Sequence, residues 1–241
     1  MGHEFSTAEE LHVDATPDEV WAAIATGPGI DSWFMGRNDV DPGQVVRQAF
    51  GGYTPEHQVS AWEPGKRLAY ESGTAPNGRF VAYEFLIEGR DQGSTVLRVV
   101  NSGFLPGDDW ADEFEAMTKG GALFMHTLAT YLNHFAGRFA TPITAFGPMI
   151  TDWPRTRAKL VEAIGQDGDR VRFTPDGLPP VDGVVYFENS DTIGIRADDA
   201  IYRFLRGFRG PVMACHHIFS DISPDATEQA WVAWLNAKDL T

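Results

Sequence analysis

The sequence predicts an α+β protein in which a curved antiparallel sheet surrounds one long helix and a smaller α+β unit follows. Two observations favour this class. Turn-forming pairs at Pro64-Gly65 and Asn77-Gly78, and a glycine-containing loop at 89–93, separate short runs rich in β-branched and aromatic residues, which is typical of a meander of hairpins. An apolar helical pattern over residues 108–137 then provides a cover for such a sheet.

The long helix is predicted by its spacing. Its apolar positions recur at alternating steps of four and three, which places them on one face of a helix with 3.6 residues per turn. Pro106-Gly107 precedes the pattern, Asp108 or Asp109 is placed to cap it, and Gly137 is placed to end it. The members of this stripe are Trp110, Phe114, Met117, Gly121, Phe124, Leu128, Tyr131 and Phe135.

Shorter elements precede this helix. The chain opens with a strand that reaches Val13, and a capping box with proline at the first helical position, Thr16-Pro17-Asp18-Glu19, then begins a short helix. A further helical turn is expected over residues 30–35. The strands that follow are expected at residues 45–50, 57–63, 68–72, 80–88 and 95–104.

Three segments are predicted along the chain: a first domain over 1–137, a linker over 138–150, and a small α+β domain over 151–241. Thr141-Pro142 and Gly147-Pro148 give the middle segment the composition of a linker. Within the last segment we expect a helix to Ile164, a short helix at 198–205 and a final helix that begins at Ser223-Pro224. Its strands are expected at residues 171–173, 183–187, 192–195 and 210–219.

Composition and charge limit the partners. The net charge of −15 over 241 residues opposes binding to nucleic acid or to an anionic membrane surface, because no basic stripe offsets it. We expect no nucleic-acid partner, no membrane partner and no signal peptide. The single cysteine, Cys215, excludes an internal disulfide and indicates a cytoplasmic protein.

The first domain resembles a known superfamily. The residues that carry the likeness include Thr16-Pro17-Asp18-Glu19-Val20-Trp21 and the later Trp33-Phe34, and they resemble the START-like (SRPBCC) superfamily. Within it the chain is most similar to the branch of activator of heat-shock protein 90 ATPase homologues. The matching stretches are residues 13–21, 30–34, 62–68, 95–104, 120–121 and 128–132.

This resemblance implies a helix-grip fold, in which a sheet grips a long C-terminal helix over a hydrophobic cavity. Members of the superfamily bind apolar molecules, cyclise polyketides or act as co-chaperones. We therefore expect a small hydrophobic or aromatic ligand between sheet and helix, with Asn101 and the tyrosines as its polar contacts. The predicted ligand-binding residues are Trp33, Phe34, Tyr70, Tyr83, Phe85, Val99, Asn101, Phe114, Met117, Phe124 and Leu128.

Catalytic and metal motifs are missing from the sequence. There is no Gly-x-Ser-x-Gly, no phosphate-binding glycine loop and no His-Glu-x-x-His. His126 and His134 lie two helical turns apart, and His216 and His217 point to opposite sides of a strand, so neither pair fits one metal ion. We expect no metal, no cofactor and no established catalytic residue, which leaves enzyme status open. Two alternatives to ligand binding remain: a cyclase-like or hydrolase-like enzyme using the same cavity, and a co-chaperone or protein-interaction module with a chaperone or a second copy as partner.

Overall fold

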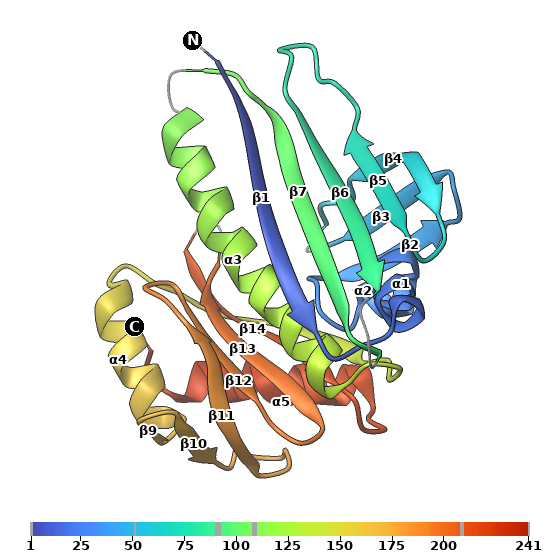
Figure 1. Ribbon diagram of the computed structural model, residues 1–241. Helices are drawn as coiled ribbons and strands as arrows, with labels where there is room; N and C mark the ends of the chain where they lie inside the picture. The colour runs from blue at the N-terminus through green and yellow to red at the C-terminus, as the bar shows by residue number, and fades with distance from the viewer. Residues whose placement is uncertain (1, 51, 90–92, 108–109, 208–209, 241) are drawn as a thin grey trace. The chain divides into compact units, whose positions relative to one another are not determined.

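The chain divides into two compact units, Met1–Phe139 and Ala140–Thr241. The structure is a computed structural model that describes residues 2–50, 52–89, 93–107, 110–207 and 210–240 (Figure 1). The predicted helix caps Asp108 and Asp109 lie outside these ranges. Each unit is an α+β fold with one antiparallel sheet, which confirms the predicted fold class.

Unit 1 contains a seven-stranded sheet in the order β1-β7-β6-β5-β4-β3-β2. The first strand therefore lies beside the last, and the remaining strands follow one another as hairpins. All neighbouring pairs are antiparallel. The strands are β1 His3–Val13, β2 Arg37–Asp41, β3 Val45–Ala49, β4 Glu56–Glu63, β5 Arg67–Ser72, β6 Phe80–Gly89 and β7 Thr95–Leu105.

The described residues of unit 1 also form three helices, and the long one is the predicted grip helix. They are α1 Pro17–Ala25, α2 Gly27–Ile30 and α3 Trp110–His134. The helix α3 runs beside β1 and β7 (Figure 1). The capping box at α1 is confirmed, because Thr16 Oγ1 accepts from the Glu19 amide and the Glu19 carboxylate accepts from the Thr16 amide. Gly137 has a φ of 78° just beyond α3, a conformation that glycine adopts without strain.

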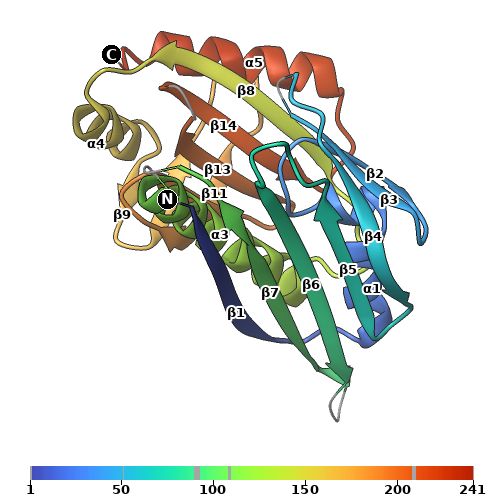
Figure 2. The ribbon, with the colours of Figure 1, turned by 90° about the horizontal axis from the view of Figure 1, so that it is seen from above.

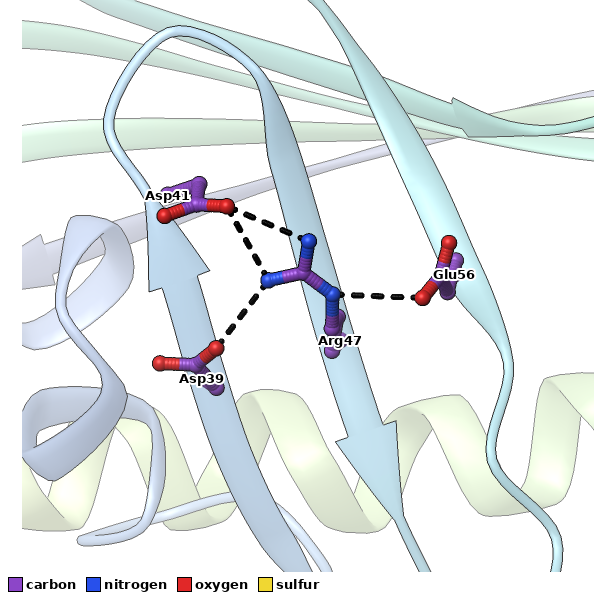
Figure 3. Close-up of polar contacts among 4 residues, drawn as sticks. All are labelled: Asp39, Asp41, Arg47 and Glu56. Carbon is purple, nitrogen blue, oxygen red and sulfur yellow. Dashed lines mark hydrogen bonds and ion pairs between the residues drawn. The ribbon is translucent and has the colours of Figure 1, made fainter.

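Strand β2 was not predicted, and it extends the sheet at its outer edge. Arg47 on β3 ties this edge to its neighbours on both sides (Figure 3). Its Nη1 lies 3.1 Å from Asp39 Oδ2, its Nη2 3.1 Å from Asp41 Oδ2, and its Nε 3.2 Å from Glu56 Oε1. One guanidinium therefore holds carboxylates of β2 and β4, which offsets the repulsion among them.

Unit 2 repeats the topology of unit 1. Its sheet runs in the order β8-β14-β13-β12-β11-β10-β9, so the first strand again lies beside the last, and a helix again ends the unit. The final helix, α5 Pro224–Ala237, packs along the edge strand β8 (Figure 2). The remaining elements are β8 Thr141–Met149, α4 Trp153–Ala163, β9 Gln166–Asp167, β10 Arg170–Phe173, β11 Val181–Glu188, β12 Thr192–Arg196, β13 Ala200–Arg206 and β14 Pro211–Ile218.

Two predictions for this part of the chain are wrong. The expected linker over 138–150 is largely strand β8, which pairs with β14 from Thr141 to Met149. Proline is tolerated there because β8 is an edge strand and one side of it needs no ladder donor. The expected helix over 198–205 is strand β13. Its buried residues Ala200, Ile201, Arg203 and Phe204 stand on both faces of the strand, so the sequence lacks the period-2 alternation of a half-buried strand.

The space between sheet and terminal helix of unit 2 is filled by aromatic rings. Trp231 and Trp234 of α5 are each 2 % exposed, and their rings lie 5.5 Å apart. Phe204 on β13 lies 5.8 Å from the Trp231 ring, and His216 on β14 lies 4.3 Å from it. This closed aromatic packing makes the sheet-to-helix space of unit 2 a solid core.

Candidate functional site

The candidate site lies in unit 1, between α3 and the face of the sheet that α3 covers. The register places Tyr70 on β5 opposite Tyr83 on β6, Tyr83 opposite Asn101 on β7, and Asn101 opposite Thr7 on β1. Directly opposed residues point to the same side of a sheet. Two residues further along, Phe85 opposes Val99 on the same face. A polar row therefore crosses the sheet beside an apolar one.

The two halves of α3 pack differently against this face. In the second half Leu128 and Tyr131 are at most 1 % exposed, and Phe135, directly after the helix, is 2 % exposed. In the first half Phe114 and Met117, on the same stripe, are only half-buried. The helix thus holds the sheet tightly toward its C-terminus and leaves its N-terminal half less covered.

Gly121 marks open space along this stripe. A Cβ built on Gly121 would meet no atom within 4 Å, whereas a Cβ on Gly103 of β7 would lie 2.3 Å from a main-chain oxygen. A glycine inside a helix costs roughly 1 kcal/mol relative to alanine, so this position carries an unfavourable residue without a close contact that requires it. No other protein atom therefore fills the position beside Gly121 or beside its neighbour Gly120, where a Cβ likewise meets nothing within 4 Å.

Two pairs of aromatic side chains lie along the less covered part of α3, and each pair has one ring on the helix. Phe5 on β1 lies 5.5 Å from Phe114, and Phe34, which follows α2, lies 4.3 Å from Phe124, measured between ring centroids. These side chains are half-buried and come from both walls. They offer an apolar and aromatic lining to anything that enters between them.

The predicted ligand-binding residues divide by burial. Five belong to the packed core: Trp33, Tyr70, Phe85, Val99 and Leu128. Trp33 also donates its indole N–H to the Ala23 carbonyl at 3.0 Å, which gives it a structural role. The other six are half-buried on the two walls: Phe34, Tyr83, Asn101, Phe114, Met117 and Phe124.

His57 on β4 is opposite Ser72, two residues along from Tyr70, so it lies diagonally beside the polar row on the same face, and sequence reasoning missed it. Its ring lies 5.6 Å from that of Tyr70 and 6.2 Å from that of Tyr83, and the residue is 7 % exposed. A shift of register between Val59 and Ala61 changes the alternation along β4. Counting back by twos from Trp62, which opposes buried Leu68, therefore places His57 on the wrong face. No signal in the sequence marks this bulge.

Burial controls the ionisation of this row. Desolvation lowers the pKa of His57 below its usual value, so the imidazole is neutral near pH 7. Desolvation likewise raises the pKa of Tyr70 and of Tyr83, which keeps both hydroxyls protonated. The row therefore offers neutral hydrogen-bonding groups and no charge.

We also examined the described residues for a metal centre, a membrane-spanning helix and a surface groove. Among them, no group of three His, Cys, Asp or Glu side chains is arranged to hold a metal ion, and no helix is long and apolar enough to cross a membrane. Unit 2 has an open surface groove of about 670 Å³, lined in part by Trp153, Arg157, Glu188 and Arg206. Arg157 pairs with Glu188, and the two arginines of the lining, Arg157 and Arg206, are matched by Glu188 and Asp191, so the charges of the groove are balanced.

Unit 1 has a helix-grip fold, in which the antiparallel sheet packs against the long helix α3. Residues 14–133 match the family model "Activator of Hsp90 ATPase homolog 1-like protein", and unit 1 belongs to this family. This confirms the resemblance drawn from the sequence. The matched residues all lie in unit 1.

Solved structures similar to the chain fall into two groups by coverage. Protein MLL2253 from Mesorhizobium loti is 25 % identical and covers 53 % of this chain and 96 % of its own, with a TM-score of 0.46. DynU16, from the dynemicin biosynthetic locus, is 20 % identical over 98 % of this chain and 97 % of its own, with a TM-score of 0.43. The di-domain ARO/CYC BexL from the BE-7585A pathway is 11 % identical over 96 % and 93 %, with a TM-score of 0.49. A search of curated proteins gives no match.

Proposed function

We propose that unit 1 binds a small apolar or aromatic molecule between α3 and the inner face of its sheet. The observation that carries this proposal is the open space beside Gly121, on the stripe of α3 that faces the sheet. Half-buried Phe114, Met117 and Phe124 flank this position along the helix. A ligand there would cover apolar surface that the fold itself leaves exposed, at about 25 cal/mol for each Å² removed from water.

The proposed contacts follow the two walls. Phe34, Phe114, Met117 and Phe124 would form the apolar lining, and Tyr83 and Asn101 would orient the ligand from the sheet. The buried predicted residues would act as the floor beneath them. Unit 2 would add no second site of this kind, because its aromatic core fills the equivalent space. We therefore expect one ligand for each chain.

Mass spectrometry of the full chain tests this proposal directly. The mass under native conditions is compared with the mass after denaturation, for protein purified without added ligand and after incubation with a panel of aromatic compounds. An added mass of one molecule per chain, lost on denaturation, supports the proposal. The absence of any bound compound from the whole panel, at concentrations up to about 1 mM, contradicts it.

His57 favours a second candidate, an enzyme that acts on a ligand in the same space. A buried neutral imidazole beside two protonated tyrosines can accept a proton while a hydroxyl donates a hydrogen bond to the oxygen that gains charge. Cyclase-like or hydrolase-like chemistry can use such a pair as its acid and base. Conversion of a bound compound, followed by its mass over time and abolished by His57→Gln with binding retained, would support this candidate. Stable, unaltered ligand would contradict it.

Two further proposals concern location and assembly, and the native spectrum tests the second. We propose that the chain acts in the cytoplasm, since its only cysteine, Cys215, is a buried free thiol. We also propose a homodimer as one assembly, which the spectrum reports as twice the chain mass. A purely monomeric mass would contradict the dimer.

A further inference from the structure

The sheet of unit 1 ends at β1, and among the described residues this strand has a partner on one side only. Its neighbour is β7, with which it pairs over all 11 residues from His3 to Val13 without a break in register. In an antiparallel pair, every second residue of an edge strand turns its N–H and C=O away from its neighbour. The outer side of β1 therefore presents a long row of backbone donors and acceptors to a further strand.

The other three edges of the two sheets carry features that discourage such pairing. Strand β2 has 5 residues, of which Arg37, Asp39 and Asp41 are charged, and β9 has only 2 residues. Strand β8 contains two prolines. Short length, charge and proline all protect a sheet edge from another chain. Strand β1 is long and has no proline, no lysine and no bulge, and its only acidic residues are three glutamates.

The sequence of β1 is complementary to a second, antiparallel copy of itself when the pair is centred on Ala8. In a two-fold pair centred on a residue, the inner faces of both sheets lie on the same side, because directly opposed residues point the same way. Centring on Ala8 uses the whole strand and places Phe5 opposite Leu11 of the second copy, both half-buried in the single chain. Ala8 itself is exposed and small, which allows the second backbone to approach.

The same centring keeps the glutamates of β1 apart. The opposing pairs across the axis are Glu4 with His12, Glu9 with Thr7, and Glu10 with Ser6. An imidazole N–H or a hydroxyl can donate a hydrogen bond to a carboxylate.

Moving the centre by one residue brings carboxylates together. With the centre on Thr7, Glu4 faces Glu10, and with the centre on Glu9 the two copies of Glu9 face each other. Like charges directly opposite each other destabilise a sheet. The charge pattern of β1 therefore favours a single register, centred on Ala8.

We propose that β1 is the surface through which two copies of this chain associate. The two β1 strands pair antiparallel around Ala8 and join both unit 1 sheets into one continuous sheet. This inference rests on the homodimer proposed above and names its interface.

Exchanging the charges across the axis tests the register. In Glu4→Lys the introduced lysine faces His12 of the second copy, and in His12→Glu the introduced glutamate faces Glu4. Each variant alone should dimerise about tenfold more weakly, since each dimer contains two such pairs. Positions 4 and 12 of one chain lie about 27 Å apart along the strand, so they cannot compensate each other within a chain.

An equal mixture of the two single variants should form a heterodimer. There the introduced lysine faces the introduced glutamate, and Glu4 of one chain faces His12 of the other. Native mass spectrometry of the full chains, with one variant isotopically labelled, separates this heterodimer from both homodimers. The double variant Glu4→Lys/His12→Glu should dimerise as the unaltered chain does.

Two further variants complete the experiment. Ala8→Lys places two lysines opposite each other on the axis and should abolish the dimer. Glu71→Lys makes the same charge change as Glu4→Lys at an exposed position of β5, away from the edge, and should leave the dimer unchanged. All four positions are exposed, so we expect the variants to fold, which circular dichroism and thermal unfolding check.

The outcomes are distinct. A monomeric mass for the unaltered chain at every concentration contradicts both the homodimer and this interface. A dimer that Ala8→Lys, Glu4→Lys and His12→Glu leave unchanged, or that does not return in the mixture, contradicts the interface and leaves the homodimer in place. Weaker association of each single variant and its return in the mixture support pairing through β1.

Discussion

Replacing Gly121 with leucine should block the ligand space of unit 1 without weakening the fold. Its Cβ would meet no atom within 4 Å, so the first added carbon enters open space. Glycine to a good helix former is worth about 0.8–1 kcal/mol in a helix interior. Partial burial of the leucine side chain adds to this, with full burial worth roughly 1.5–3 kcal/mol.

The expected result for Gly121→Leu is therefore a stability gain of at least about 1 kcal/mol, or roughly 2–4 °C in Tm for a domain of this size. Ligand binding should fall at least about tenfold, because the leucine occupies volume that the ligand needs. Calorimetric unfolding of the full chain measures the first quantity and equilibrium dialysis with 2-naphthol the second.

Lys119→Leu is the matched control, because Lys119 is exposed and, two residues from Gly121, lies on the opposite side of the same helix. It adds the same side chain without entering the space, so binding should not change. The reasoning is refuted if Gly121→Leu lowers Tm, which would mean that the space is already filled. It is also refuted if Gly121→Leu binds the probe as well as the Lys119→Leu control does.

Three further predictions address the supports of the fold. Thr16→Ala removes one half of the capping box and should cost about 1 kcal/mol, measured by urea unfolding, whereas Thr16→Ser should cost much less. Gly183→Ala would place a Cβ 2.6 Å from a main-chain oxygen of β12 and should destabilise unit 2 by about 1–3 kcal/mol; an unchanged Tm would show that the strands can separate freely. Burial lowers the pKa of His57 and of His216 in the folded chain. Below about pH 6.5 the two histidines therefore bind more protons in the unfolded chain than in the folded chain, which favours unfolding. Stability should then fall as pH decreases from 6.5 to 5, and His57→Gln should flatten that slope; an equal slope in the variant would contradict the role of His57.

The long helix and the meander of unit 1 follow from local chemistry. The stripe from Trp110 to Phe135 has a single period, Thr16 begins α1 with a capping box, and Asn77-Gly78 forms a tight turn. Each of these signals depends only on residues close by in the chain. It can therefore be recognised without knowing the rest of the structure. The predicted face of Asn101 is confirmed by the register for the same reason.

Unit 2 was harder to predict because its signals depend on tertiary context. Pro142 and Pro148 indicate a linker until the position of β8 at the edge of the sheet is known. Burial on both faces of β13 removes the alternation that marks a strand. The repeated strand order of the two units is visible only once the sheets are assembled.

By itself the sequence determined the fold of unit 1, its family and the walls of the proposed site, because periodicity and turn chemistry act over a few residues. Only the tertiary structure decided that Trp33, Phe85 and Leu128 are packed core and that His57 lies beside the polar row. Burial depends on what covers a residue, and a bulge in β4 changes which side chains face inward. Both are set by contacts between segments far apart in the chain, which no local pattern records.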